Sequence, residues 1–480
     1  MAFDTLNFIL FFIINFILYW KIFSKSNNFQ NTYLLVISFL FYSFWDLRFT
    51  ILLALNILIG YFCGKILANT NNLSKRKIIF NAGVLSLLSF LLIFKYYNFF
   101  IQNFVDLFSF LGLNIDGFYL NIILPVGISF YTFHGVSYLH DLYYKKIDQE
   151  TSIVNYGVFI SYFPLLVAGP IERASTLLPQ LKKKRFFNYN FSVSGLRLIL
   201  LGMFKKVVIA DPLSVFNDTI FLNYNSLDFT ILILGAIGFS VQVYADFSGY
   251  TDMARGISRL MGIELIKNFN FPFFSKSIPE FWSRWHISLS SWMNDYIFKP
   301  CAVYFRDYRK YGILIAIFIT FFISGLWHGA SWNFIVWGLL YAFLYIPYLF
   351  FFKKSFIINT NNSSLSLKDL ANVFIIFIMV CIAFVFFRLQ NISDAFEYLE
   401  RIFTLAKLES EYVFYNSQKI LLSAHVLLII FIDYCLFSSN YIYKLTLRSS
   451  LFRYLIYSTM LCLILIYFNR TGAQFIYFQF

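Results

Sequence analysis

The chain has 480 residues, of which 59% are hydrophobic and 13% carry a charge. Soluble domains contain roughly 45–50% apolar and 25% charged residues, so this composition excludes a water-soluble globular protein. The formal net charge of +14 comes from basic residues dispersed between apolar runs, and this dispersal excludes a nucleic-acid-binding face.

Stretches without Asp, Glu, Lys or Arg predict the helices that cross the membrane, each of which needs about 20 mostly apolar residues. The first stretch lacks a basic leader and a small-residue cleavage site, so we expect a retained helix and not a signal peptide. The stretches are Thr5–Trp20, Ser26–Trp45, Phe49–Gly64, Ile78–Phe94, Gly117–His140, Thr151–Ile171, Phe229–Ala245, Tyr311–Phe352, Ala371–Phe387, Ile420–Ile432 and Tyr454–Phe468. Because Tyr311–Phe352 is long enough for two crossings, we expect an all-α polytopic membrane protein with about eleven transmembrane helices.

Loop charges predict the orientation. Basic residues follow the first and third stretches, whereas acidic residues are more prominent after the second and fourth. Cytoplasmic loops are enriched in Lys and Arg, so we expect the N-terminus outside and the basic loops in the cytoplasm of a cell with an inner membrane.

The middle of the chain, residues 177–309, is more polar and is punctuated by Gly and Pro. Irregular backbone cannot face lipid, so this part predicts re-entrant or interfacial helices around a central channel. Apolar and acidic residues alternate at helical spacing over 392–403, which predicts one amphipathic interfacial helix. We expect a single membrane domain over 1–480, with N-terminal helices in 1–116, a catalytic core in 117–340 and C-terminal helices in 341–480.

Two histidines lie among tryptophans, in WSRWHISLSSW (282–292) and GLWHGASWNFIVWG (325–338). His328 is the only histidine in a stretch of 42 residues, 311–352, that contains no Asp, Glu, Lys or Arg. An ionisable side chain inside a membrane segment is a functional-site hypothesis, and imidazole suits proton transfer near neutral pH. The scattered cysteines form no metal-ligand spacing, so we expect no metal and no bound cofactor.

Six blocks resemble the membrane-bound O-acyltransferase family, in its bacterial alginate and peptidoglycan O-acetyltransferase branch. They are ILPVGISFYTFHGVSYLHDLYY (123–144), YFPLLVAGPIER (162–173), YADFSGYTDMARGISRLMGIEL (244–265), NFPFFSKSIPEFWSRWHISLSSW (270–292), GLWHGASWNFIVWG and the final FIYFQF. The resemblance implies that His328 is the catalytic histidine and that His286 supports it. It also implies acetyl-CoA as the acyl donor and, as partner, a polysaccharide acceptor or an extracytoplasmic acetyltransferase.

Acyl transfer to an alcohol needs a base, a stabiliser for the oxyanion and exclusion of water. His328 can act as the base or carry the acyl group itself. We expect uncharged donors from Asn333 and from the indoles of Trp327 and Trp332, and a narrow site for a short acyl group formed with Trp285.

Three charged or titratable groups have open interpretations. Asp246 binds the donor, orients a histidine, or forms a structural ion pair with Arg255 or Arg259. The basic run 182–185 meets either coenzyme A phosphates or anionic membrane lipid. His140 and Asp141 are adjacent on an expected helix, where neighbours do not face each other, so we expect no pairing between them.

Three other functions remain open from the sequence. A D-alanyl transferase of the same family would modify teichoic acid with a donor from a carrier protein. A polysaccharide or lipid transporter would need charged residues along a continuous path. A structural scaffold would leave the buried imidazole of His328 without a role.

Overall fold

The computed structural model describes residues 2–351, 366–407, 416–437, 449–468 and 475–476. Every regular element in these ranges is helical, which confirms the all-α prediction. The chain divides into two compact units, residues 1–197 with 254–266, and residues 198–253 with 267–480. The family block at the end of the sequence lies outside the described residues except for Phe475 and Ile476.

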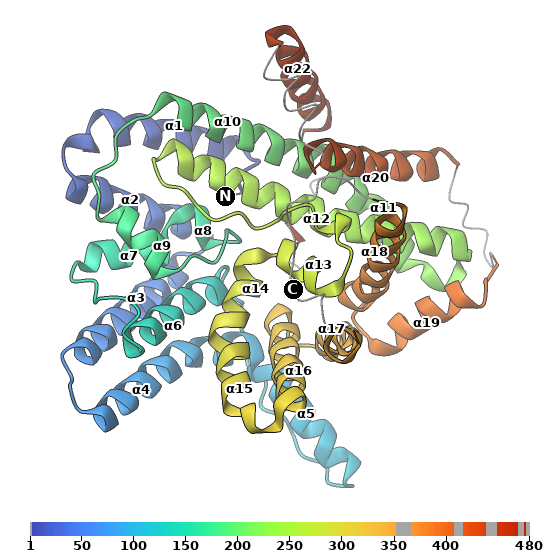
Figure 1. Cartoon of the computed structure of the whole chain (residues 1–480), viewed down its shortest axis with the longest axis horizontal. Helices are drawn as coiled ribbons and strands as arrows, with labels where there is room; N and C mark the ends of the chain where they lie inside the picture. Colours follow the sequence, from blue (N-terminus) through green and yellow to red (C-terminus); the bar gives the residue numbers. More distant parts are fainter. Residues whose placement is uncertain (1, 352–365, 408–415, 438–448, 469–474, 477–480) are drawn as a thin grey trace. The chain divides into compact units, whose positions relative to one another are not determined.

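The first unit contains the blue to green helices of Figure 1. In this unit α3 packs against α4 and α6, and α2 packs against α7. The helix bounds are α1 Leu6–Lys21, α2 Asn27–Ser43, α3 Leu47–Ala68, α4 Leu73–Leu91, α5 Tyr97–Phe110, α6 Ile128–Tyr143, α7 Ile153–Ser161, α8 Phe163–Leu166 and α9 Ala174–Leu181, with a π-helical segment at Leu92–Tyr96 joining α4 to α5. The helix α10, Tyr189–Met203, continues into the second unit.

Two of the predicted membrane-spanning stretches are wrong. Residues 113–125 have no regular structure, so the stretch 117–140 becomes helical only where α6 begins after the left-handed Gly127. The stretch 151–171 forms α7 and the four-residue α8, because Pro164 and Gly169 interrupt it and the chain bends to bury nearly all of it in protein. Apolar composition alone does not distinguish burial in protein from burial in lipid.

The second unit is built on long helices of the chain's second half. The helix α16 packs along α17, and α17 packs against α18. The bounds are α11 Asp211–Leu222, α12 Phe229–Leu260, α13 Ile278–Arg284, α14 Ile287–Met293, α15 Lys299–Tyr304, α16 Arg309–His328, α17 Trp332–Phe350, α18 Leu367–Arg388, α19 Ile392–Phe403, α20 Asn416–Phe437 and α22 Ser450–Tyr467. A π-helical segment, η3 at Phe204–Ala210, precedes α11.

Eight helices in the described ranges are long and apolar enough to cross a membrane, so the protein is a multi-pass membrane protein. The stretch 311–352 yields two of them, α16 and α17, as predicted. The amphipathic helix is confirmed as α19, which buries Ala395 and Tyr398 and exposes charged residues. The eight spans do not test the predicted count of about eleven, because they cover the described residues alone.

Candidate active site

His328 is the last residue of α16, directly before the turn that leads into α17. Ser331 begins α17 by accepting a hydrogen bond from the backbone N–H of Asn333. A side chain at Gly325 would lie 2.3 Å from the carbonyl oxygen of Phe334, and one at Gly329 would overlap the Phe334 ring. The two glycines therefore let α16 and α17 approach closely beside the histidine.

The imidazole of His328 is buried among aromatic rings from three helices. Its centroid lies 4.8 Å from Trp327, 4.8 Å from Trp337 and 5.2 Å from Phe387. The rings meet edge to face, which is the favourable geometry for aromatic pairs. His328 is 5% exposed, so the surrounding rings fix the imidazole and exclude water from it.

His286 lies between α13 and α14, in a left-handed conformation with φ of 42°. Two backbone hydrogen bonds hold this turn, from Ile287 N–H to the Asn268 carbonyl and from Asn270 N–H to the Arg284 carbonyl. Positive φ is uncommon for a residue other than glycine and concentrates at functional sites. These two hydrogen bonds between segments 268–270 and 284–287 therefore hold His286 in a backbone conformation that it does not favour on its own.

The Asn268 side chain determines the tautomer of His286. Its Oδ1 accepts from the Ser288 backbone N–H at 3.1 Å and from the Ser288 hydroxyl at 2.9 Å, and it lies 3.2 Å from His286 Nδ1. Because that oxygen only accepts, Nδ1 carries the proton and the lone pair is on Nε2. Burial lowers the pKa of His286 to about 3, so the imidazole is neutral near pH 7.

The two histidines share one aromatic neighbour. His286 lies 6.0 Å from the ring of Trp327, and His328 lies 4.8 Å from the same ring. The two imidazoles are therefore separated by no more than these distances combined. The Nε2 atom of His286 is buried and has no hydrogen-bond partner among the described residues, so it can accept a hydrogen bond from a substrate.

Three buried donors near this cluster also lack a hydrogen-bond partner among the described residues. They are the indole N–H groups of Trp282 and Trp337 and the hydroxyl of Tyr341. Trp337 and Tyr341 are one turn apart on α17, and both rings contact Trp282, at 5.8 Å and 4.9 Å. A buried donor without an acceptor costs about 1–3 kcal/mol, so these groups favour a ligand that supplies oxygen atoms.

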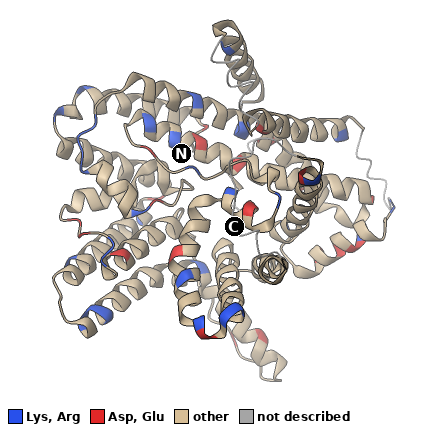
Figure 2. Ribbon diagram, viewed as in Figure 1, with Lys and Arg blue, Asp and Glu red and all other residues tan. Residues whose placement is uncertain are grey.

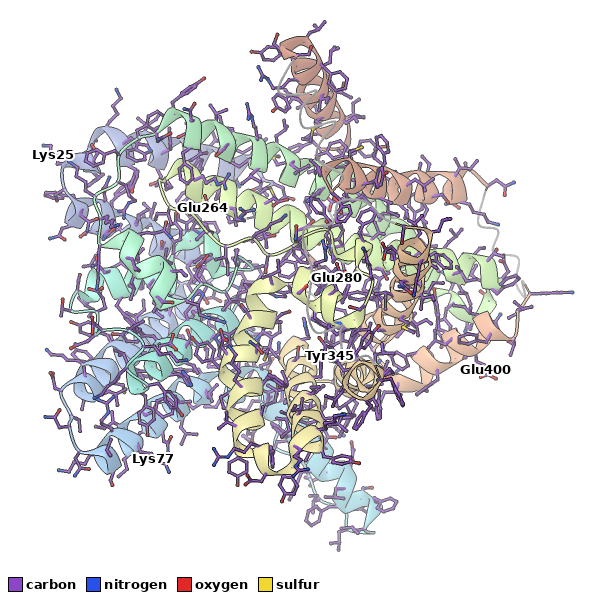
Figure 3. All side chains as sticks on the ribbon, in the orientation of Figure 1. Lys25, Lys77, Glu264, Glu280, Tyr345 and Glu400 are labelled. Carbon is purple, nitrogen blue, oxygen red and sulfur yellow. The ribbon has the colours of Figure 1, made fainter. Side chains whose placement is uncertain are left out.

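Trp282 also lines a cavity of about 300 Å³ within the second unit. The walls are mostly apolar and come from α13, α14, α16 and α17, with hydroxyl groups from Ser290, Thr320 and Ser324. Phe321 and Tyr345 complete the side formed by α16 and α17. Trp282 therefore contacts both this cavity and Trp337 of the ring cluster around His328 (the position of Tyr345 is labelled in Figure 3).

The sequence pattern that defines the membrane-bound O-acyltransferase family matches residues 6–389 of the chain. The chain belongs to this family. It is 30% identical to the peptidoglycan O-acetyltransferase of Helicobacter pylori over 95% of this chain and 93% of that protein. It is 33% identical to the probable alginate O-acetylase AlgI of Pseudomonas aeruginosa, over 79% of this chain and 71% of that protein. It is also 30% identical to the teichoic acid D-alanyltransferase of Bacillus subtilis, over 48% of this chain and 61% of that protein.

The family match makes this chain an O-acyltransferase. The site residues predicted from the sequence differ in how deeply they are buried and in what they contact. Trp285 is buried and stacks on Phe281 at 5.5 Å. Trp332 is 51% exposed, and the Asn333 amide donates to the carbonyl of Leu389 at 2.6 Å. The ring cluster of the two histidines thus contains Trp327 and Trp337, whereas Asn333 binds the end of α18.

Asp246 lies in an ion network of the acyltransferase core. It is 3.0 Å from Lys206 Nζ, which also pairs with Asp211 at 2.8 Å. Its other oxygen accepts from the backbone N–H of Ile476 at 2.8 Å. Pairing of Asp246 with arginine is a wrong prediction, because Arg255 and Arg259 both pair with Glu264 after the chain turns back beyond α12.

The remaining histidines have structural contacts. His134 Nε2 accepts from the Glu172 backbone N–H, and His425 Nδ1 lies 2.6 Å from the Leu421 carbonyl. The absence of a His140–Asp141 pair is a wrong prediction, because Nδ1 and Oδ1 lie 3.3 Å apart. The pair forms in the last turn of α6.

Sequence reasoning missed three residues of this site. Asn268 lies 18 residues before His286 and Phe387 lies on α18, so both are outside the histidine blocks, and no spacing rule links them to His286 or His328. Trp337 falls inside the second block, and its i, i+4 relation to Tyr341 on an expected helix was a usable signal. Helical phasing of the block therefore finds Trp337, whereas Asn268 needs the tertiary structure.

Proposed function

We propose that the protein transfers an acetyl group from acetyl-CoA to a hydroxyl of a cell-envelope polysaccharide, directly or through an extracytoplasmic acetyltransferase. The observation that carries this proposal is the pair of buried histidines that both contact Trp327, in a chain of the O-acyltransferase family. The similarity to the Helicobacter pylori peptidoglycan O-acetyltransferase over nearly the whole chain supports acetyl transfer and an envelope acceptor.

His328 is the proposed general base. It takes the proton of the acceptor hydroxyl while the hydroxyl oxygen attacks the thioester carbonyl carbon. The tetrahedral intermediate then expels the coenzyme A thiolate, which takes the proton back from the imidazolium. The water-excluding rings around His328 support this role, because they limit hydrolysis of the donor.

His286 is the proposed orienting group for the acceptor. Its proton on Nδ1 faces Asn268, and its Nε2 lone pair is left for a hydroxyl hydrogen. A neutral imidazole with a strongly lowered pKa is a weak base, so His286 suits hydrogen bonding better than proton removal. This assignment leaves His328 as the group that takes the proton.

The indole N–H of Trp337 is the proposed oxyanion donor. It is an uncharged donor in direct ring contact with His328 and has no acceptor among the described residues. Removal of one such donor typically lowers kcat about 10²–10³-fold. The hydroxyl of Tyr341 is the second candidate because it lies one turn away.

The localisation proposed is the cytoplasmic membrane with the N-terminus outside, so that donor and acceptor reach the site from opposite faces. The basic loops after α1 and α3 support this orientation. Cysteine labelling with a membrane-impermeant reagent at a residue placed before α1 tests it, since protection from external reagent contradicts the proposed orientation.

The second candidate is D-alanyl transfer, which the similarity to the Bacillus subtilis teichoic acid D-alanyltransferase favours. Mass spectrometry of envelope polymers from deletion and complemented strains distinguishes the two. Loss of O-acetyl ester on deletion and its return on complementation support the proposal. Loss of D-alanyl ester with unchanged acetylation refutes it.

A further inference from the structure

The loop between α9 and α10 carries three consecutive lysines followed by Arg185, Phe186 and Phe187. Figure 2 shows this loop as a continuous basic segment on the first unit. Lys183 and Lys184 are exposed and form no ion pair among the described residues, whereas Lys182 pairs with Glu150 at 3.2 Å. The exposed positive charge of the loop therefore comes mainly from Lys183 and Lys184.

Arg185 differs from these lysines because it is buried. Its Nε donates to the Tyr19 hydroxyl at 2.6 Å, and its terminal nitrogen donates to Asn31 Oδ1 at 2.6 Å. The Gln30 side chain bonds both the N–H and the carbonyl of Arg185. These hydrogen bonds attach the middle of the loop to α1 and α2, so the Arg185 side chain is not available to a ligand.

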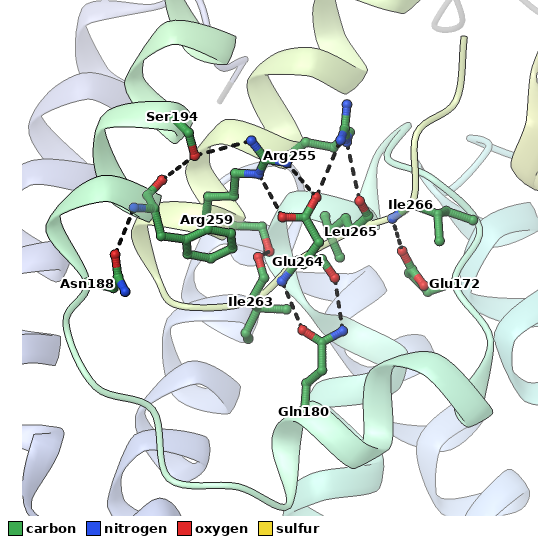
Figure 4. Close-up of polar contacts among 12 residues, drawn as sticks. Glu172, Gln180, Asn188, Ser194, Arg255, Arg259, Ile263, Glu264, Leu265 and Ile266 are labelled. Carbon is green, nitrogen blue, oxygen red and sulfur yellow. Dashed lines mark hydrogen bonds and ion pairs between the residues drawn. The ribbon is translucent and has the colours of Figure 1, made fainter. Parts of the chain in front are cut away.

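The two ends of the loop are held as well (Figure 4). Before it, the Gln180 amide makes two hydrogen bonds to the Glu264 backbone, at 3.0 Å and 2.9 Å. After it, the Asn188 side chain accepts from the Phe191 N–H at the start of α10. Fixation at both ends and in the middle gives the loop one conformation, with its lysines directed outward.

Large aromatic side chains lie next to the exposed lysines. Phe186 and Tyr189 are each 72% exposed, and Phe187 is 52% exposed. Lys184 Nζ lies 5.2 Å from the Phe186 ring, while the Phe187 ring lies 5.7 Å from Trp20 at the end of α1. Exposed aromatic rings beside lysines are typical of a segment at the level of lipid headgroups, where both ends of such side chains are stabilised.

We propose that this loop together with the first residue of α10, residues 182–189, binds anionic phospholipid at the membrane surface. Lys183 and Lys184 contact the phosphate groups, and Phe186 and Tyr189 enter the boundary between headgroups and acyl chains. Each lysine near an anionic membrane surface contributes about 1 kcal/mol, which corresponds to about fivefold in affinity. The rigid anchoring through Arg185 favours this, because little conformational entropy is lost when lipid binds. The inference does not depend on the chemistry proposed for the histidines.

The start of α4 provides a control with a similar set of charges. Lys75 and Lys77 are exposed, and the buried Arg76 beside them donates to backbone carbonyls, so the charge pattern is the same. No aromatic residue lies between Leu67 and Lys77. Figure 3 shows Lys77 at the opposite end of the first unit from Lys25, which follows α1.

The test is native mass spectrometry of the purified full-length protein titrated with phosphatidylglycerol and, separately, phosphatidylcholine of the same chains. We expect Lys183→Gln/Lys184→Gln to weaken phosphatidylglycerol binding at least about tenfold, and Lys75→Gln/Lys77→Gln to change it less than about threefold. We expect Phe186→Ser to weaken the same binding with the lysines intact. Phosphatidylcholine binding stays unchanged in all three.

Three results overturn the proposal. Equal losses in the two lysine pairs show diffuse attraction by net charge. Unchanged phosphatidylglycerol binding in Lys183→Gln/Lys184→Gln shows that lipid binds elsewhere. Weakened binding of free coenzyme A in that variant, with phosphatidylglycerol binding retained, assigns the loop to the donor phosphates. Thermal unfolding of each variant, within a few degrees of wild type, establishes that a measured loss comes from the loop and not from unfolding.

Discussion

His328→Gln is the most direct test of the proposed chemistry. Glutamine retains a similar volume and a hydrogen-bonding group, but it cannot take up a proton near pH 7. Removal of a general base typically lowers the rate 10²–10⁴-fold, which is about 2.7–5.4 kcal/mol of transition-state stabilisation. We expect acetyl transfer by the variant to fall by at least about a hundredfold.

We expect the same substitution, His328→Gln, to lower stability much less than activity. The imidazole makes edge-to-face contacts with Trp327, Trp337 and Phe387, and an aromatic pair contributes about 0.5–1.5 kcal/mol. Glutamine recovers part of this through van der Waals contact, so we expect a loss of stability of less than about 3 kcal/mol. Activity therefore falls far more than stability.

The assay is transfer from radiolabelled acetyl-CoA by purified protein in proteoliposomes, with thermal unfolding measured in parallel. His425→Gln is the matched control, because His425 is also buried on a helix of the second unit and contacts a tyrosine ring. A rate for His328→Gln above about a tenth of wild type would place the base elsewhere, with His286 the next candidate. A rate loss in His425→Gln equal to that in His328→Gln would show a structural effect.

Three further changes probe the surroundings of the two histidines. Trp337→Phe keeps the ring but removes the N–H, so we expect kcat to fall about 10²–10³-fold with little change in KM, measured by steady-state kinetics. Gly325→Ala places a methyl group against the Phe334 carbonyl, and we expect about 1–3 kcal/mol of destabilisation with loss of activity, measured by thermal unfolding. For His286→Gln we expect less destabilisation by acid than in wild type. The pKa of His286 is about 3 in the folded protein and about 6.5 in the unfolded chain, so between these values only the unfolded chain binds the proton and wild type loses stability as pH falls below about 6.5.

For each of these three variants, one result would contradict the expectation. Wild-type kcat in Trp337→Phe would remove the indole from the proposed oxyanion site. Unchanged stability in Gly325→Ala would show that α16 and α17 separate without cost. An identical fall in melting temperature from about pH 7.5 to about pH 5 in wild type and His286→Gln would show that His286 is protonated in the folded state.

The sequence by itself determined the class of the protein and predicted two histidine blocks as its candidate site. Composition required a membrane protein, because so few charged residues cannot cover a soluble core of this size. The charge-free stretch around His328 predicted two membrane crossings, and α16 and α17 are these two helices, with His328 as the last residue of α16. These features depend on local composition, which is fully present in the sequence.

The tertiary structure decided which residues meet. Asn268 reaches His286 across 18 residues of chain, and Phe387 reaches His328 across an intervening helix. Apolar stretches such as 151–171 are buried by other protein segments and form short helices, a result that hydropathy cannot distinguish from a membrane span. The tautomer of His286 likewise follows from which atom of Asn268 faces Nδ1. Hydrophobicity and helical periodicity act locally along the chain, whereas these contacts join segments distant in sequence, and only the folded arrangement brings such segments together.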